Sequence, residues 1–235
     1  MVSGHKNFLK LLGCCLEFEY PVLVCEYAER IPYNNTPNLG MLIKMAKEIA
    51  VAVSYLHTAF PRTMVHMDIQ PSNIFLDSNG TAKLSGFCLS VSIPEGETFV
   101  KVDADRVEGV LDYLEYKYVT SGVVNENTDV FSFGVLLQNL LIGKYGEVDR
   151  CQGDESLFEH EHNRVCKFVE EGRVFEILDP QILENMSDDD ENREQERRRM
   201  QAVIVLSLKC TGHRGDVPKM VEVAKELQRI ELWML

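Results

Sequence analysis

The sequence predicts an α+β fold in which short hairpins come first and helices make up most of the chain. Two apolar runs, 9–18 and 21–27, are separated by a short acidic turn and are typical of an antiparallel hairpin. Most of the remaining chain shows helical stripes of apolar residues. With 235 residues, 45% of them hydrophobic, the chain is long enough to bury a sizeable core. Strand patterns followed by a run of helices are typical of α+β domains.

Periodicity and turn chemistry predict the later elements. Apolar residues recur at helical spacing in 39–57, and the strongly apolar stretch 128–141 predicts a buried helix. Residues 73–76 and 81–84 flank the turn sequence Asp-Ser-Asn-Gly and predict a second hairpin. We also expect loops at 30–38, 93–106 and 187–192, and helices at 157–171, 173–178, 193–210 and 218–230.

The composition excludes some classes of ligand. The formal net charge is −13, which opposes non-specific binding to nucleic acid or anionic membranes because both need basic surfaces. No run approaches the ~20 apolar residues of a membrane span, and the polar start has no signal-peptide core. Seven cysteines without C-x-x-C spacing predict reduced, mostly buried thiols of an intracellular protein instead of a zinc site.

Two short motifs carry most of the functional information. Residues 65–73 read Val-His-Met-Asp-Ile-Gln-Pro-Ser-Asn, and residues 83–88 read Lys-Leu-Ser-Gly-Phe-Cys. They resemble the catalytic loop H-R-D-x-K-x-x-N and the metal-binding D-F-G of a protein kinase. Four positions depart from the family pattern: Arg, Lys, Asp and Gly of the motifs are replaced by Met67, Gln70, Gly86 and Cys88.

The resemblance extends over nearly the whole chain. Residues 5–17, 23–27, 129–135 and 178–180 match plant receptor-like kinases in order and at kinase spacing. The pattern of losses is most similar to the receptor-like cytoplasmic kinases called ZED-related kinases. The resemblance implies a single truncated protein-kinase-like domain. Residues 1–27 would form a remnant of the N-lobe with the hinge, and residues 28–235 a complete, mainly helical C-lobe.

The resemblance also allows the chemistry of a kinase to be checked position by position. ATP is held by a Gly-rich loop and a strand Lys, and neither G-x-G-x-x-G nor V-A-I-K occurs in the chain. Gly86 offers no carboxylate to Mg²⁺, and Gln70 cannot neutralise a moving phosphoryl group. We therefore expect a pseudokinase without nucleotide or metal cofactor, in which Asp68 and Asn73 are vestigial.

Other motif residues are expected to support the fold. The resemblance assigns His66 and Phe87 to the hydrophobic core. Asp129 lies in an apolar helix, where a lone carboxylate would be costly. The resemblance implies that this position bonds to the catalytic-loop backbone, so we expect Asp129 to be a buried structural anchor. The buried Glu–Arg pair of kinases is replaced at both positions, by Lys117 and Val217, a change that can be neutral.

Two surfaces are candidates for binding protein partners. One is the hairpin 9–27, part of whose apolar face is predicted to be uncovered. A partner covers it, or it packs on the C-lobe, or the gene product is longer. The other is the loop 90–108, the counterpart of the activation segment. Its candidate partner-binding residues are Ser90, Ser92, Thr98, Lys101 and Arg106.

The expected function is that of a cytosolic adaptor or decoy in plant signalling, with a role in innate immunity. The resemblance implies two kinds of partner: an intracellular nucleotide-binding leucine-rich-repeat receptor (NLR) and active receptor-like cytoplasmic kinases. The location would be cytoplasmic, including the periphery of the plasma membrane through partners. Two alternatives stay open, a weak residual ATP-dependent Ser/Thr kinase and a truncated gene product with no stable function.

Overall fold

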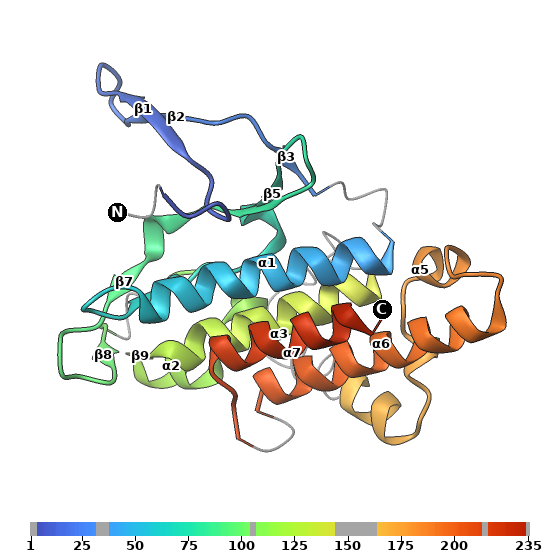
Figure 1. Ribbon diagram of the computed structural model, residues 1–235. Helices are drawn as coiled ribbons and strands as arrows, with labels where there is room; N and C mark the ends of the chain where they lie inside the picture. The colour runs from blue at the N-terminus through green and yellow to red at the C-terminus, as the bar shows by residue number, and fades with distance from the viewer. Residues whose placement is uncertain (1–3, 32–37, 104–106, 144–163, 213–215, 234–235) are drawn as a thin grey trace.

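Four long helices form the body of the protein. The computed structural model describes residues 4–31, 38–103, 107–143, 164–212 and 216–233 (Figure 1). Helix α1 (Leu39–Thr58) packs on α7 (Met220–Leu232), and α3 (Glu126–Ile142) packs on α6 (Asp190–Cys210). The helices predicted over 39–57 and 128–141 are confirmed. No helix in the described ranges is long and apolar enough to cross a membrane.

A small sheet lies against the start of the body. The predicted second hairpin is confirmed as β5 (Ile74–Leu76) and β6 (Ala82–Leu84). Its turn is stabilised by Asp77, whose Oδ1 accepts hydrogen bonds from the backbone N–H groups of Asn79 and Thr81. Strand β3 (Glu29–Arg30) pairs with β5. Arg30 therefore belongs to a strand instead of the expected loop.

The first hairpin is also confirmed, and it extends away from the helices (Figure 1). Strands β1 (Leu11–Cys15) and β2 (Val22–Cys25) form an antiparallel ribbon that we call the β1–β2 ribbon. Its apolar residues are uncovered, as expected: Leu11 is 50% exposed, Leu23 59% and Val24 51%. Lys83 of β6 joins the end of the ribbon to the small sheet, since its Nζ lies 3.2 Å from Glu26, which follows β2, and 3.6 Å from Asp77 in the β5–β6 turn.

Three expected loops or helices differ in the structure. Within 93–106, strand β8 (Val100–Lys101) pairs with β9 (Val123–Val124). The acidic run 187–192 is half helical, because Asp189 caps α6 and the acidic residues that follow favour a helix N-terminus. Only one 3₁₀ turn, η5 (Val174–Glu176), forms within 173–178.

The remaining short elements connect the larger ones. Residues 164–170 are helical, while 157–163 of the expected helix lie outside the described residues. Strand β4 (Met64–Val65) pairs with β7 (Val91–Ser92). The other elements are η1 (Pro71–Asn73), η2 (Phe87–Leu89), η4 (Leu111–Tyr113), α2 (Tyr116–Ser121) and α5 (Pro180–Glu184).

The prediction that the cysteines are mostly buried is wrong for the described residues. Cys14, Cys25 and Cys88 are exposed, and of the six described cysteines, none of which forms a disulfide, only Cys210 is buried. The reason is topological, since Cys14 and Cys25 lie on the ribbon that extends away from the body. Burial raises the pKa of the Cys210 thiol to about 12.

A buried arginine joins helix α6 to the last helix, α7. Arg199 of α6 is 2% exposed, and its Nε donates a hydrogen bond of 3.1 Å to the carbonyl of Ile230 near the end of α7. Burial lowers the pKa of its guanidinium, opposed by the carboxylates of Glu196 and Glu231. The charge-assisted bond satisfies one of the carbonyls that a helix end leaves without an intrahelical partner.

We expect Arg199→Ala to lower the free energy of unfolding by about 2–4 kcal/mol, because it leaves a cavity and an unpaired carbonyl. Arg198→Ala is the matched control, because Arg198 is the next residue and its side chain is 70% exposed. Chemical denaturation of both variants checks this. Equal stability of the two variants would show that Arg199 does not fix α7.

Candidate functional site

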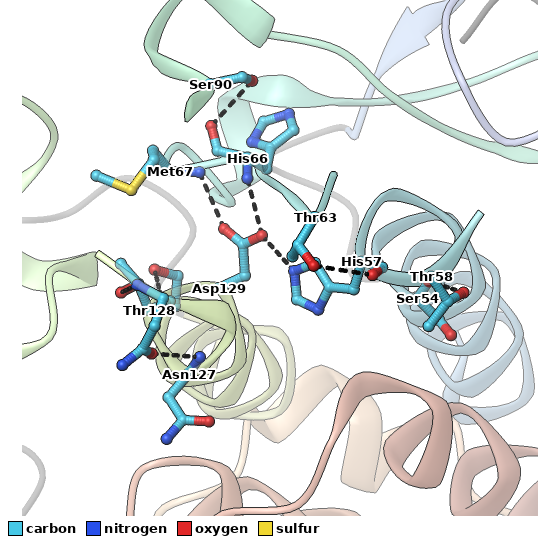
Figure 2. Close-up of polar contacts among 12 residues, drawn as sticks. Ser54, His57, Thr58, Thr63, His66, Met67, Ser90, Asn127, Thr128 and Asp129 are labelled. Carbon is cyan, nitrogen blue, oxygen red and sulfur yellow. Dashed lines mark hydrogen bonds and ion pairs between the residues drawn. The ribbon is translucent and has the colours of Figure 1, made fainter. Parts of the chain in front are cut away.

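A buried carboxylate lies at the centre of the motif region. Asp129, in the first turn of α3, has no exposed surface. Its Oδ1 accepts a hydrogen bond of 2.9 Å from the backbone N–H of Met67. Its Oδ2 lies 2.8 Å from the backbone N of His66 and 2.8 Å from Nε2 of His57 (Figure 2). Three donors thus offset the cost of burying this charge.

His57 is a member of this site that the sequence motifs do not reveal. It lies in the last turn of α1, is 6% exposed, and reaches Asp129 with Nε2. One signal was available in the sequence: a lone histidine at the end of a strongly apolar helix stripe needs a polar partner. The partner is 72 residues away along the chain, so periodicity alone could not identify it.

His66 links the catalytic loop to the Gly86-Phe87 motif. Its Nε2 lies 2.9 Å from the carbonyl oxygen of Ser85, so Nε2 carries the proton, and Nδ1 accepts a hydrogen bond of 3.2 Å from the backbone N–H of Asp68. The ring is fully buried and meets Phe87 edge-on, with ring centroids 4.9 Å apart. Burial lowers the pKa of His66 despite the nearby carboxylates of Asp129 and Asp68, and the imidazole is neutral.

Phe87 is half-buried and packs against the main core. Its ring centroid lies 5.5 Å from that of Phe8, which is 2% exposed. The backbone N–H of Leu84 donates to the carbonyl of Asn7, and that of Leu9 to the carbonyl of Leu84. These bonds hold the segment around Phe8 beside β6. His66 and Phe87 thus lie in packed surroundings.

The carboxylate of Asp68 is closed off by two amide side chains. Asn73 donates from Nδ2 to Oδ2 of Asp68 at 2.6 Å and to its backbone carbonyl at 2.8 Å. Gln70, which replaces the kinase Lys, donates from Nε2 to Oδ1 of Asp68. Both carboxylate oxygens therefore already accept hydrogen bonds from neutral groups of the same loop.

Asn73 also fills the space that a D-F-G aspartate would need. Gly86 has φ +82°, a left-handed conformation that favours glycine. A Cβ at position 86 would lie 2.5 Å from both Nδ2 and Oδ1 of Asn73. The residues present therefore do not fit a magnesium–nucleotide complex. In the described part of the chain, no group of three or more His, Cys, Asp or Glu could hold a metal ion.

The partner-binding candidates are dispersed along the segment after Phe87. Ser90 is half-buried, and its Oγ donates to the carbonyl of His66 at 3.2 Å (Figure 2). Ser92 and Lys101 are exposed on β7 and β8. Thr98 is exposed and lines a surface depression of about 540 Å³. Arg106 lies outside the described residues.

Glu115 is half-buried two residues before Lys117, one of the two replaced positions of the kinase Glu–Arg pair. Glu115 accepts a hydrogen bond of 3.3 Å from the hydroxyl of Thr128. Burial raises the pKa of Glu115, while Thr128 and Lys117 act in the opposite direction.

We expect Asp129→Ala to lower the free energy of unfolding by at least about 3 kcal/mol, because it leaves two backbone N–H groups and a histidine without an acceptor. Glu126→Ala, in the same first turn but half-exposed, is the control and should change stability little. Urea unfolding of the two variants tests this. A small effect of Asp129→Ala would remove Asp129 from its central position.

The neutral state of His66 predicts a pH dependence of stability. Its pKa is lowered from 6.5 in the folded state, so the unfolded chain binds more protons in the window below pH 6.5. The free energy of unfolding should therefore fall as the pH drops through this window. His5, whose pKa is also lowered by burial, contributes in the same direction. Thermal unfolding between pH 7.5 and 5.5 should show a flatter slope for His66→Gln, and an unchanged slope would contradict the burial of a neutral imidazole.

Comparison with known proteins identifies the family of this chain. Residues 1–206 match the family described as protein tyrosine and serine/threonine kinase. The chain is 68% identical over 251 residues to the serine/threonine-protein kinase ZRK4 of Arabidopsis thaliana, covering 99% of this chain and 69% of that protein.

Two other relatives from Arabidopsis thaliana carry different names. The non-functional pseudokinase ZRK15 is 45% identical, with 97% of this chain and 64% of that protein aligned. The non-functional pseudokinase ZED1 is 42% identical, with 98% of this chain and 70% of that protein aligned. The chain thus spans between about two thirds and seven tenths of these relatives' lengths. The predicted protein-kinase-like fold is confirmed, and the chain belongs to the protein tyrosine and serine/threonine kinase family, with homology to the ZRK kinases and pseudokinases.

Proposed function

We propose that this chain is a catalytically inactive, kinase-like adaptor or decoy that binds protein partners. One observation carries the proposal: Asp68 is closed by the amides of Gln70 and Asn73, and Asn73 occupies the space beside Gly86. In the loop that would position a substrate hydroxyl and a metal ion, the side chains of Gln70 and Asn73 donate hydrogen bonds to the carboxylate of Asp68.

The chemistry of phosphoryl transfer explains why this closure matters. The reaction depends on positive charge around the transferred group, supplied by a lysine and by magnesium held on carboxylates. Gln70 is neutral, Gly86 has no side chain, and Asp68 would have to give up both hydrogen bonds to accept a proton. Each missing electrostatic contribution removes orders of magnitude in rate.

The retained frame supports a role in binding. Asp129, His57 and His66 keep the catalytic loop in place although it lacks the charged groups of a kinase. ZRK15 and ZED1 are named non-functional pseudokinases, which agrees with a fold that is retained while the charged groups of catalysis are lost. We propose an intracellular NLR receptor and active receptor-like cytoplasmic kinases as partners, in the cytoplasm and in plant innate immunity.

A second candidate function is a weak Ser/Thr protein kinase. Asp68 is retained at the position of the catalytic base, and ZRK4, at 68% identity, is named a serine/threonine-protein kinase. A base alone contributes about 10²–10⁴-fold in rate. Substituting Asp68 separates the two functions, because an adaptor does not need proton transfer. Asp68→Asn should therefore keep partner binding.

We expect millimolar Mg-ATP to leave the melting temperature of the protein unchanged within about one degree. A ligand raises the melting temperature only when its concentration exceeds its dissociation constant for the folded protein. Gly86→Asp should not restore binding, because Asn73 and the left-handed backbone oppose a side chain there. An active receptor-like cytoplasmic kinase serves as the positive control. A shift of several degrees in the unmodified chain would favour the kinase function.

Two surfaces should bind different partners. Substituting Leu12, Leu23 and Val24 by Ser changes the exposed ribbon and should weaken a persistent partner, because an uncovered apolar edge favours a stable contact. Substituting Ser92, Thr98 and Lys101 by Ala should change which kinase is bound.

Co-precipitation of candidate partners tests this, with Val221→Ser as the control at an exposed apolar position on α7. If both sets of substitutions leave every interaction intact while changes on the surface of 164–210 abolish them, the assignment of the two surfaces is wrong.

A further inference from the structure

A shallow groove lies between helices α1 and α7, which pack on each other in the body of the protein (Figure 1). We call it the α1–α7 groove. Its volume is about 320 Å³. Neither the β1–β2 ribbon nor the catalytic loop contributes to it. Its apolar lining is Val51, Val221 and Ala224, and its polar lining is Lys47, Ser54, Lys225 and Gln228.

Two valines, one from each helix, remain uncovered in this groove. Val51 of α1 and Val221 of α7 are each 37% exposed, whereas their neighbours Ala52, Val53 and Val223 have no exposed surface. A single apolar residue on a protein surface is ordinary, but two that line one groove form a small apolar floor. The groove can therefore receive an aliphatic side chain of another molecule.

The charged residues that line the groove are both cations, Lys47 and Lys225. The whole chain has 37 acidic and 24 basic residues, so a lining with two lysines and no carboxylate reverses the overall charge locally. Lys47 forms an ion pair with Glu231 at the edge of the groove, which compensates part of its charge.

Lys225 is the cation that stays available to another molecule. The two carboxylates nearest to it along α7 have other partners. Glu222 accepts a hydrogen bond of 2.8 Å from the backbone N–H of Lys219, and Glu226 pairs with Arg229 at 3.0 Å. Within the part of the chain that the structure describes, Lys225 forms no ion pair. An exposed lysine beside an apolar floor favours a carboxylate of a partner.

We propose that the α1–α7 groove binds an acidic amphipathic helix of a partner protein. An aliphatic side chain of that helix would lie on Val51 and Val221, and one of its carboxylates would pair with Lys225. In helix-in-groove binding, the apolar stripe supplies affinity and the flanking charges select the partner. The two lysines disfavour a basic helix. This groove is a third surface that shares no residue with the ribbon or with the loop 90–108, and its use does not depend on the loss of catalysis.

Titration of the whole chain with two matched helical peptides, followed by amide NMR, tests this proposal. One peptide carries a leucine stripe flanked by glutamates, and the other has lysine in place of each glutamate. The glutamate peptide should shift the amide signals of Val51, Val221 and Lys225, and should bind at least about tenfold more tightly than the lysine peptide.

Charge reversal in the groove provides the second measurement. Lys225→Glu should weaken binding of the glutamate peptide by about tenfold or more, because it places like charges opposite each other. Lys209→Glu, at an exposed lysine of α6, makes the same change in net charge and is the matched control. It should weaken binding by less than about twofold, because salt screens charges that are not in contact. Val221→Ser should weaken the same peptide by removing part of the apolar floor, while the partners of the ribbon and of the loop stay bound.

Four results would overturn the proposal. They are absence of binding at millimolar glutamate peptide, equal affinities of the two peptides, a Lys225→Glu variant that binds like the unmodified chain, and amide shifts confined to residues outside α1 and α7. Any of them would leave the proposed function untouched. The nucleotide test concerns Asp68, Asn73 and Gly86, and the co-precipitation test concerns substitutions in the ribbon and the loop.

Discussion

The carboxylate of Asp129 is the interaction on which the arrangement of the motif region depends. It lies in an apolar helix without solvent, so it is tolerated only because His57, His66 and Met67 all donate to it. Those donors come from α1 and from the catalytic loop, and α3 contributes the acid (Figure 2). One buried charge therefore fixes three parts of the chain relative to one another.

Two further arrangements follow from that anchor. With its backbone held, His66 places a neutral ring between the Ser85 carbonyl and Phe87, which connects the catalytic loop to β6 and the main core. The backbone of Met67 is held in a left-handed conformation. Its side chain packs in a second hydrophobic cluster, separate from the main core, with Val65, Ile93, Leu114, Tyr118 and Val124. The same carboxylate thus supports both hydrophobic clusters, and the catalytic loop lies between them.

The losses in the motifs follow a physical pattern. Charged groups that would act on a phosphate have been replaced by neutral ones, and Asp68 is satisfied by Gln70 and Asn73 within its own loop. A carboxylate without such partners would be costly in a half-buried site. The anchor at Asp129, where loss of the acid would leave several donors unpaired, is retained. The stability of the fold therefore accounts for the retention of Asp129.

Sequence patterns predicted the parts of the fold that depend on local periodicity. The helices at 39–57 and 128–141 and both hairpins follow from apolar spacing and turn residues. The long-range features were not predictable in this way. His57, Arg199 and the burial of Met67 depend on partners or neighbours far along the chain. The cysteines were misjudged because apolar neighbours on a two-stranded ribbon do not ensure burial.

Motif resemblance supplied what periodicity could not, namely that 65–73 and 83–88 lie together. It could not reveal that Asn73 turns toward Asp68 and fills the space beside Gly86, because a motif match does not fix side-chain conformations.

We propose that this loop is closed to metal and nucleotide, and paramagnetic broadening by Mn²⁺ tests that proposal most directly. Amide NMR signals of the chain would be recorded during addition of Mn²⁺ with ATP. We predict no selective broadening of the amides of Asp68, Asn73 and Gly86 relative to exposed acidic positions such as Asp190. Selective broadening at those three amides at sub-millimolar Mn-ATP would show that the site opens and binds, and would contradict the account.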